Sequence, residues 1–360
     1  MKKLKLAIIG LAHPHTSPLY RTLASHPDEV ECIGFANLPS DDMTHEERVN
    51  QLGPVGKADL QAGRLREYSD WRELLKEKPD VAVVTADNRA CPDICCELMK
   101  QRIVVINEKP MAMCYADAKR MATCSRENGV PIITNWPIAW FPAFRKAKEL
   151  ADAGAVGRVM RVTYRSPATW GPFAYGKPEE DKARTWWYRS ERGGGSLLDY
   201  ACYGTVLATW LFGRRAERVC AITKQFTTAA YSDVEDYSAM ILDFGDGVGL
   251  CEGSWSTFNC GQIPTGPVIY GIEGTIVCDR YSSTVKVYRG AEHKPVDPVE
   301  MYETEPDRQV ELLGRNIIDF LRGEAPLNDM LTLDINMDVV AALDAGIRSA
   351  ESGQFVAVEQ

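Results

Sequence analysis

The sequence predicts an α/β N-terminal domain built on a doubly wound parallel sheet, followed by an α+β domain with a large, mostly antiparallel open sheet. Three observations predict this. The chain has 360 residues, more than one ordinary core needs, so we expect two domains, 1–135 and 136–360. Apolar runs alternate with amphipathic stretches throughout the first domain. In most of the second domain, polar and apolar residues alternate with a period of two.

Five apolar runs of the first domain are expected to be buried strands: residues 4–9, 30–35, 81–85, 103–107 and 131–135. Four stretches between them have helical spacing and a polar outer face: 18–25, 70–77, 92–101 and 115–128. Strands that alternate with helices pair in parallel and carry the helices on both faces of the sheet. The first domain is therefore predicted to be doubly wound.

The second domain begins with an amphipathic helix, 143–153, and a strand, 157–164. A loop rich in Gly, Pro and Trp leads to an apolar helix, 196–212, and antiparallel strands with glycine turns are expected from 216 to 289. Two closing helices, 308–322 and 333–352, could pack back on the first domain. The outward face of the sheet is expected to be apolar and to form a homodimer or homotetramer. Depending on the strand register, its expected members include Ile222, Met240, Leu242, Leu250 and Trp255.

Composition excludes several classes of function. A net charge of −9 argues against a nucleic-acid binder, which needs a basic face. No apolar stretch approaches the ~20 residues that span a bilayer, and the N-terminal apolar run is too short for a signal peptide. We therefore expect a cytoplasmic protein with a small-molecule substrate and no membrane partner.

The passage AIIGLAHPHTSPLYRTL puts Gly10 directly after the first strand and before a helix. Such a unit aims backbone N–H groups and the positive end of the helix dipole at a pyrophosphate. Of the three glycines of the G-x-G-x-x-G pattern only the first is present, because Ala12 and His15 hold the other positions. The passage nevertheless predicts a Rossmann-type dinucleotide site with Gly10 and Ala12 beside the cofactor.

His13 and His15 allow two interpretations. They cover a phosphate or the nicotinamide of the cofactor, or they are polar turn residues that cap the next helix. An H-x-H pair also invites a metal interpretation. No carboxylate or cysteine lies near the pair in sequence, so no metal is predicted.

Asn37 follows the second strand, where an acidic residue normally binds the ribose hydroxyls. An amide can bind a hydroxyl but is a poor partner for a phosphate, and no Arg or Lys occurs from residue 35 to residue 47. NAD is therefore favoured, with NADP as the alternative. Further cofactor contacts are expected at the ends of the later strands, from Thr85, Ala86, Asn88, Glu108, Lys109 and Asn135.

The tripeptide Glu108-Lys109-Pro110 follows a buried strand, at the sheet edge where ligands bind. The run INEKPMAM and the later passage GGGSLLDYACYG resemble the glucose-fructose oxidoreductase/inositol dehydrogenase (Gfo/Idh/MocA) family. Similar passages, among them GAVGRV, VEDYSAMILDFGDG and GIEGTI, extend the resemblance over nearly the whole chain. The resemblance implies an NAD(P)-dependent enzyme that moves a hydride to or from a hydroxyl or carbonyl carbon of a sugar, polyol or related molecule.

In that family the EKP lysine surrounds the reacting carbon together with an aspartate and a histidine, four residues apart on the helix after GGG. The matching positions hold Lys109, Asp199 and Tyr203, so the resemblance implies these as catalytic residues. The histidine is replaced by a tyrosine, as in the dihydrodiol and xylose dehydrogenase branches. Without the resemblance, Lys109 would be a solvated loop lysine and Tyr203 a packing residue.

Trp140 and Arg189 are expected to contact the substrate. Indole rings stack on the C–H faces of carbohydrates, and a guanidinium donates to hydroxyl or carboxylate oxygens. The alternative is that these residues, with the other loop tryptophans, fill the domain junction. The loop tryptophans are Trp136, Trp140, Trp170, Trp186 and Trp187.

Two other functions stay open. The same site could oxidise a sugar transiently and so promote elimination or glycoside cleavage, with NAD regenerated. Alternatively, the incomplete glycine pattern and the missing histidine fit a dinucleotide-binding regulator without turnover, whereas Lys109, Asp199 and Tyr203 argue against it.

Overall fold

The computed structural model describes residues 2–38, 43–167, 178–257, 264–290, 296–305 and 309–360. The chain forms two compact units, each with its own sheet. The first unit consists of Met1–Trp136, Gly176–Gly194 and Val310–Met337. The second consists of Pro137–Tyr175, Gly195–Gln309 and Asp338–Gln360.

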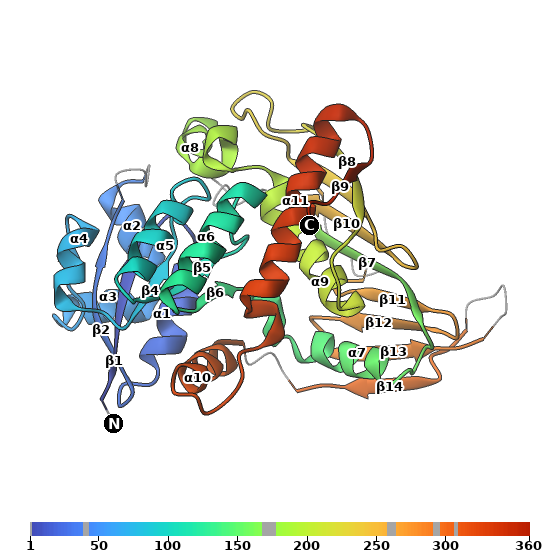
Figure 1. The fold of residues 1–360 in the computed structure, drawn as a ribbon, viewed down its shortest axis with the longest axis horizontal. Helices are drawn as coiled ribbons and strands as arrows, with labels where there is room; N and C mark the ends of the chain where they lie inside the picture. Colours follow the sequence, from blue (N-terminus) through green and yellow to red (C-terminus); the bar gives the residue numbers. More distant parts are fainter. Residues whose placement is uncertain (1, 39–42, 168–177, 258–263, 291–295, 306–308) are drawn as a thin grey trace. The chain divides into compact units, whose positions relative to one another are not determined.

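The sheet of the first unit is parallel and has the strand order β3-β2-β1-β4-β5-β6 (Figure 1). Its strands are β1 (Leu4–Ile9), β2 (Val30–Ala36), β3 (Glu67–Tyr68), β4 (Val81–Val84), β5 (Val104–Glu108) and β6 (Ile132–Asn135). The strand order reverses between β1 and β4, and ligands of such sheets bind at the carboxyl ends of the strands beside this point. The predicted doubly wound fold is confirmed.

Helices connect the parallel strands. Because crossovers are right-handed, those running from β1 toward β3 and those running from β4 toward β6 cover opposite faces of the sheet. They are α1 (Thr16–Ala24), α2 (His45–Gln51), α3 (Gly53–Gln61), α4 (Trp71–Leu74), α5 (Cys91–Lys100) and α6 (Tyr115–Asn128). Most of α10 (Gln309–Leu321) also belongs to this unit, where Gly314 N donates to Thr22 Oγ1 at 2.8 Å.

The sequence interpretation missed α2, α3 and β3. A capping box begins α2, with Thr44 and Glu47 each bonding the other's backbone N–H, and this signal was readable in the sequence. Gly53 and Pro54 interrupt the helical pattern that follows, which hid α3. Strand β3 has only two residues, too few for any periodicity.

The second unit contains a nine-stranded sheet of order β14-β13-β12-β11-β7-β10-β9-β8-β15. Neighbouring strands are antiparallel except β7 and β10, which are parallel. The strands are β7 (Val159–Pro167), β8 (Arg218–Lys224), β9 (Tyr237–Asp243), β10 (Val248–Ser254), β11 (Val268–Gly271), β12 (Thr275–Asp279), β13 (Thr284–Tyr288), β14 (Glu300–Glu303) and β15 (Val356–Ala357). The predicted open, mostly antiparallel sheet is confirmed.

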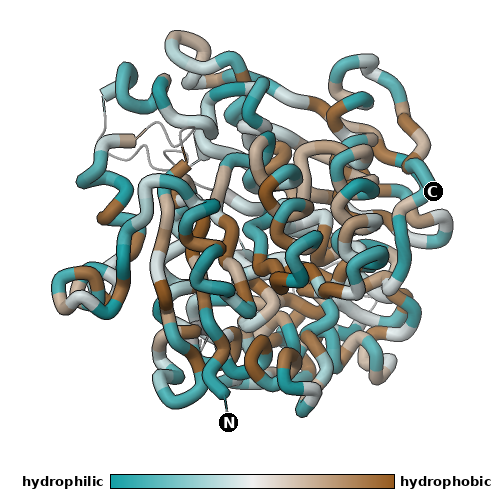
Figure 2. Tube along the Cα trace, turned by 60° about the vertical axis from the view of Figure 1, so that its left-hand side comes forward, coloured by the Kyte–Doolittle hydropathy of each residue, from teal (hydrophilic) through white to brown (hydrophobic). Residues whose placement is uncertain are grey.

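Helices cover one face of this sheet, and Figure 1 shows α7 (Pro142–Asp152) and α9 (Cys202–Phe212) against the strands. A π-helical segment, Leu197–Ala201, leads into α9, and α11 (Leu333–Ser352) packs on β9, where Gly346 faces Met240. In Figure 2 many turns are hydrophilic, whereas the helices carry hydrophobic and hydrophilic residues side by side, as amphipathic helices do. The short α8 (Glu179–Arg184) belongs to the first unit.

The outward face of the second sheet agrees only in part with the expected one, because Ile222 and Leu250 lie on it and the other three expected residues do not. Met240, Leu242 and Trp255 are buried, with at most 2% exposure, whereas Ile222 is 50% and Ile241 42% exposed. Side chains alternate across a strand, so a shift of one residue exchanges the two faces. On β9 the odd-numbered residues face outward, and the sequence pattern did not determine this phase.

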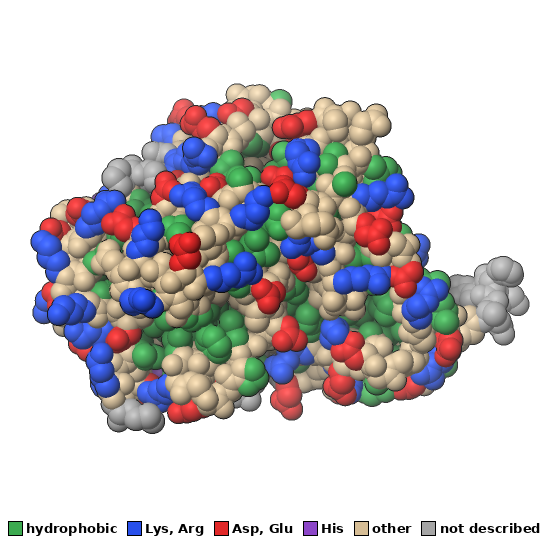
Figure 3. All heavy atoms as spheres, in the orientation of Figure 1, with side chains coloured by type: hydrophobic (Ala, Val, Ile, Leu, Met, Phe, Trp, Pro, Cys, Tyr) green, Lys and Arg blue, Asp and Glu red, His purple; other side chains and the backbone are tan. Residues whose placement is uncertain are grey.

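Charges of both signs are interspersed over the surface drawn in Figure 3, without a large field of one sign. Within the part of the chain that the structure describes, no helix combines the length and apolarity needed to cross a bilayer.

Candidate active site

Gly10 ends β1 and begins the turn to α1. Its φ is +79°, a left-handed conformation that disfavours any side chain. A Cβ here would also lie only 3.0 Å from Ala86 N and 3.1 Å from Leu38 Cδ1. A glycine is therefore required at the switch point of the sheet, between the ends of β1 and β4.

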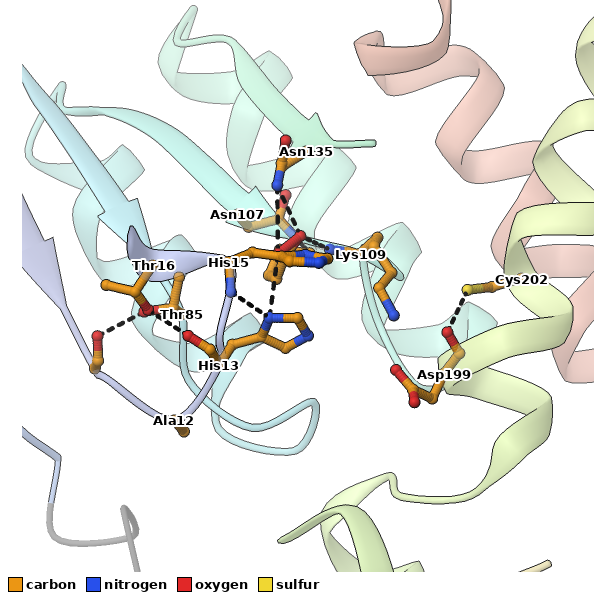
Figure 4. Close-up of polar contacts among 12 residues, drawn as sticks. Ala12, His13, His15, Thr16, Thr85, Asn107, Lys109, Asn135, Asp199 and Cys202 are labelled. Carbon is orange, nitrogen blue, oxygen red and sulfur yellow. Dashed lines mark hydrogen bonds and ion pairs between the residues drawn. The ribbon is translucent and has the colours of Figure 1, made fainter. Parts of the chain in front are cut away.

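Hydrogen bonds join this turn to the end of β4. Thr85 Oγ1 donates to Gly10 O at 2.6 Å, and Ala12 N donates to Thr85 O at 3.0 Å. Thr16 Oγ1 lies 2.6 Å from His13 O and 2.9 Å from Thr85 Oγ1 (Figure 4). The backbone of the turn is thus held in place although two of the usual glycines are missing.

His15 occupies the third glycine position of the pattern and is the N-cap residue of α1. Its side chain is half-buried, and its Nδ1 lies 2.6 Å from Glu108 Oε2 at the end of β5. Glu108 Oε1 accepts from Lys109 N and from Asn135 Nδ2, both at 3.0 Å. The carboxylate therefore ties together the ends of β1, β5 and β6.

Lys109 is only 3% exposed, so it is not the solvated loop lysine of the alternative interpretation. Figure 4 shows its side chain extending from the end of β5 beside the His13 and His15 rings. Asn135 Oδ1 is buried without a hydrogen-bond partner among the described residues. A ligand group that donates a hydrogen bond would satisfy it.

His13 is buried, and its Nδ1 accepts from His15 N at 3.2 Å, which leaves its proton on Nε2. Desolvation lowers the pKa of His13 well below its ordinary value, and the charges of His15 and Lys109 lower it further. His13 is therefore neutral at neutral pH. A neutral imidazole beside a lysine adds no second positive charge to the site.

Two tryptophans of the first unit cover the turn. Trp186 Nε1 donates to Ala12 O at 3.0 Å, and the His13 ring lies 5.5 Å from the Trp187 ring, centroid to centroid. They belong to the 3₁₀ turn Trp186–Tyr188. Both tryptophans therefore contact the turn between β1 and α1.

The structure brings Glu108 to the H-x-H pair, which the sequence interpretation lacked. His13, His15 and Glu108 place three potential ligand atoms within 4.8 Å of one another. However, His13 Nδ1 already accepts from His15 N, and His15 Nδ1 is bonded to Glu108. The absence of a metal therefore stays a prediction.

A carboxylate near Asn37 was also missed. Glu67 on β3 accepts from Asn37 Nδ2 at 3.0 Å, because β3 pairs in parallel with the end of β2. Asn37 Oδ1 is buried and has no hydrogen-bond partner among the described residues. No sequence motif contains Glu67, which lies 30 positions after Asn37. Only the pairing of the two strands brings it there.

Asn88 and Asp87 follow β4 and hold the segment before the glycines Gly193–Gly195. Asn88 Nδ2 donates to Gly193 O at 2.8 Å. Asp87 Oδ2 accepts from Arg192 Nη2 at 2.7 Å, and Asp87 Oδ1 accepts from two N–H groups at the start of α5. Asn88, an expected cofactor contact, thus also has a structural bond.

Arg189, an expected substrate contact, belongs to the first unit. It lines a hollow of about 500 Å³ together with Met43 and Thr44, which follow β2. The other residues of the hollow are Ala183, Arg184, Glu191 and Arg192. In Rossmann domains the end of β2 lies on the adenosine side of the cofactor.

In the second unit, Asp199 lies in the π-helical segment and is 7% exposed. Its Oδ2 accepts from Trp255 Nε1 at 3.0 Å. Its carbonyl accepts from Cys202 Sγ at 3.3 Å, as Figure 4 shows. π-helical turns are rare and occur often at functional sites. The buried carboxylate is therefore paired, as burial requires.

Tyr203 is half-buried at the start of α9, and its ring makes an edge-to-face contact with Tyr200. Trp140 is 3% exposed, and its Nε1 is buried without a hydrogen-bond partner among the described residues. Both residues belong to the second unit. Trp170 lies outside the described residues.

Two family models match the chain. Residues 4–136 match the oxidoreductase family with an NAD-binding Rossmann fold, and residues 144–277 match the GFO/IDH/MocA C-terminal domain. The chain belongs to the Gfo/Idh/MocA family of oxidoreductases. The resemblance that the EKP and GGG passages indicated is thereby confirmed, and NAD is the cofactor of the matched Rossmann domain.

Curated relatives match over part of their length. A dTDP-3,4-didehydro-2,6-dideoxy-alpha-D-glucose 3-reductase of Streptomyces violaceoruber is 29% identical over 54% of this chain and 52% of its own. A trans-1,2-dihydrobenzene-1,2-diol dehydrogenase of Xenopus tropicalis is 26% identical over 63% of this chain and 64% of its own. The matches thus span about half to two thirds of these relatives.

Solved structures share the whole fold. Levoglucosan dehydrogenase in complex with NADH and levoglucosan superposes with a TM-score of 0.81 at 17% identity, over 100% of both chains. The WlbA dehydrogenase of Bordetella pertussis in complex with NADH and UDP-GlcNAcA has a TM-score of 0.76 at 22% identity, again over 100% of both chains. At these identities the similarity concerns the fold.

Proposed function

We propose that this protein is an NAD-dependent oxidoreductase that interconverts a hydroxyl and a carbonyl group of a sugar, polyol or related small molecule. The observation that supports it best is the cluster at the carboxyl edge of the first sheet. There, Lys109 is buried beside neutral His13, and Glu108 is held by His15 and Asn135. A buried lysine kept next to uncharged or anionic groups suits an oxygen that gains negative charge.

The residues of the first unit fit a dinucleotide. Two buried amide oxygens, Asn37 Oδ1 and Asn135 Oδ1, lack hydrogen-bond partners among the described residues. The ribose hydroxyls and the carboxamide NH2 of NAD are donors that would satisfy such acceptors. When bound, the nicotinamide supplies or accepts the hydride.

The residues supply binding and proton transfer. Lys109 polarises the substrate oxygen and stabilises its developing charge. Tyr203 exchanges the hydroxyl proton, a role that the family resemblance implies for the position where other members have a histidine. Asp199, whose Oδ2 is bonded to Trp255, orients the substrate hydroxyl as an acceptor.

The sugar or polyol class is supported by the relatives, which include a dTDP-sugar reductase and a myo-inositol 2-dehydrogenase of Thermotoga maritima. Trp140 also supports it, because its buried Nε1 has no hydrogen-bond partner within the described ranges and would donate to a substrate hydroxyl. Arg189 is a weaker candidate for the substrate, since its hollow is shared with Met43 and Thr44.

We further propose a homodimer or homotetramer formed through the outward face of the second sheet, where Ile222 and Ile241 are exposed. A cytoplasmic location is proposed for the protein because the described cysteines are free thiols and NAD turnover requires the cellular cofactor pool.

The test measures reduced nicotinamide by absorbance across aldoses, polyols and keto-sugars, with wild type and Tyr203→Phe. We expect turnover with one class, slowed by about 10²–10⁴ in the variant, the usual range for a lost general acid or base. Tyr200→Phe, which alters the neighbouring ring, is the control. Product without net NADH would replace the proposal by transient oxidation. Tight NADH binding without any product would replace it by a regulator.

A further inference from the structure

Glu235 contacts the beginning of the helical segment that carries Asp199 and Tyr203. Its Oε1 accepts from Leu197 N at 2.8 Å, and its backbone carbonyl accepts from Ser196 N at 3.1 Å. All of these residues belong to the second unit. The first N–H groups of a helix have no partner within the helix, so Glu235 satisfies a donor that would otherwise be unpaired.

The last glycine of the GGG passage, Gly195, packs closely against the same carboxylate. Gly195 has a φ of +105°, and a Cβ at this position would lie 2.5 Å from Glu235 Oε1 and 2.7 Å from Oε2. Only a glycine lets the chain pass this close to the carboxylate. The close packing of Gly195 against Glu235 therefore lets the carboxylate reach the start of the helical segment.

The pKa of Glu235 is raised by some of its surroundings and lowered by others. Desolvation raises the pKa of its carboxyl group to about 7, while the bond from Leu197 N opposes this rise and the charge of Asp236 adds to it. Asp236 is itself held by three N–H groups, those of Phe226, Thr227 and Thr228. Other titratable groups on the surrounding elements are Asp199 and Tyr200 on the helical segment, Tyr237 on β9, and Glu252 with Arg165 on β10 and β7.

We propose that Glu235 is a positioning residue whose ionised carboxylate holds the start of the helical segment that carries Asp199 and Tyr203, so that its protonation lowers turnover. The inference rests on the proposed function for its catalytic consequence. Its structural part is independent of that function.

The physical reason is the strength of the bond. A hydrogen bond from an N–H to an ionised carboxylate is roughly twice as strong as one to a neutral group, and the positive end of the helix dipole favours a negative charge there. The proton on Glu235 removes both contributions. Below neutral pH the start of the π-helical turn is then held less firmly, and Asp199, two residues after Leu197, loses its fixed position.

The structural part can be read at a single atom pair. Ser196-Leu197 is the only Ser-Leu pair of the chain, so labelling serine with carbonyl-¹³C and leucine with ¹⁵N gives one peak, that of Leu197 N–H, in an HNCO spectrum. We expect its proton shift to titrate near pH 7 in the full-length wild type. A shift that stays constant from about pH 5.5 to about pH 8.5 would overturn the proposal without reference to any activity.

The catalytic part is tested with Glu235→Gln and, as the matched control, Glu303→Gln, which changes an exposed carboxylate on β14. We expect kcat of wild type and control to fall on the acid side of pH 7. Glu235→Gln should have a kcat about tenfold lower at pH 8, without that fall, and an unchanged Kd for NADH. Glu235→Asp, which keeps the charge, should retain the acid-side fall.

The outcomes separate the two proposals. If the Leu197 peak titrates but no substrate is turned over, the positioning role of Glu235 is supported and the proposed function is wrong. If kcat of Glu235→Gln falls below pH 7 as it does in wild type, the proposed role of Glu235 is wrong and the proposed function is supported.

Discussion

His15 Nδ1 lies 2.6 Å from Glu108 Oε2, although 93 positions separate the two residues in the sequence. The bond links the turn after β1 to the end of β5, and Glu108 also accepts from the backbone N of Lys109. A histidine at a glycine position of the dinucleotide pattern thus helps to orient the strand end that presents the lysine. Replacing the third glycine of the pattern by His15 thus adds a bond that holds Glu108, the residue before Lys109.

Lys109→Ala tests the role of that lysine. We expect kcat to fall by about 10³-fold, because the ammonium stabilises charge in the transition state, while the Kd for NADH changes little. Stopped-flow turnover and fluorescence titration measure the two quantities. Lys100→Ala, at the exposed end of α5, is the control. Unchanged turnover in Lys109→Ala would remove the lysine from the mechanism.

His13 makes the stability of the protein depend on pH. Its pKa is lowered in the folded state, so the unfolded chain binds the proton more readily. The stability due to neutral His13 is present above pH 6.5, the ordinary value, and is lost as the pH falls below it. We expect the drop in Tm between about pH 7.5 and about pH 5.5 to be smaller in His13→Gln than in wild type.

The control for this experiment is His45→Gln, whose side chain is 63% exposed. It should show the wild-type drop in Tm. An equal drop in His13→Gln and wild type would mean that His13 is protonated in the folded state, and the neutral tautomer would be wrong.

The fold class could be predicted from the sequence because the two kinds of strand differ in pattern. Buried parallel strands are continuous apolar runs, whereas antiparallel strands with one covered face alternate polar and apolar residues. The family could also be predicted, through EKP and GGG. Contacts between distant positions left no such pattern. Glu67 reaches Asn37 through strand pairing, and Glu108 reaches His15 through the order of the sheet. Likewise, the π-helical turn at Asp199 has the same sequence signal as an α-helix.

The contact between Asn37 and Glu67 leads to a prediction on the choice between NADH and NADPH. From the sequence alone, Asn37→Asp is expected to widen the preference for NADH by adding a carboxylate. In the structure Asn37 Nδ2 already donates to Glu67, so a second carboxylate would be repelled there. We therefore expect Asn37→Asp to weaken NADH binding, and Glu67→Gln to reduce the preference for NADH over NADPH by about tenfold, because a carboxylate repels the 2′-phosphate.

Fluorescence titration of both cofactors measures this preference. Glu73→Gln, on the exposed surface of α4, is the matched control and should keep the wild-type ratio. Tighter binding of NADPH than NADH by wild type would contradict the role of Glu67 and would favour the arginines of the hollow at Thr44 as phosphate ligands.

The outward face of the second sheet predicts self-association, and the observed register identifies its centre. Ile241 pairs with Cys220 on β8 and with Leu250 on β10, and Ile241 and Ile222 are exposed on this face. A second copy with the same face would bury these side chains symmetrically.

Ile241→Lys would place a charge at the centre of that contact, where desolvation without a partner is costly. We expect light scattering at micromolar concentration to give a dimer or tetramer mass for wild type and a monomer mass for Ile241→Lys. Ile272→Lys, which changes an exposed isoleucine beyond the end of β11, should keep the wild-type mass. A monomeric wild type would mean that the exposed isoleucines remain in water and that the proposed assembly is wrong.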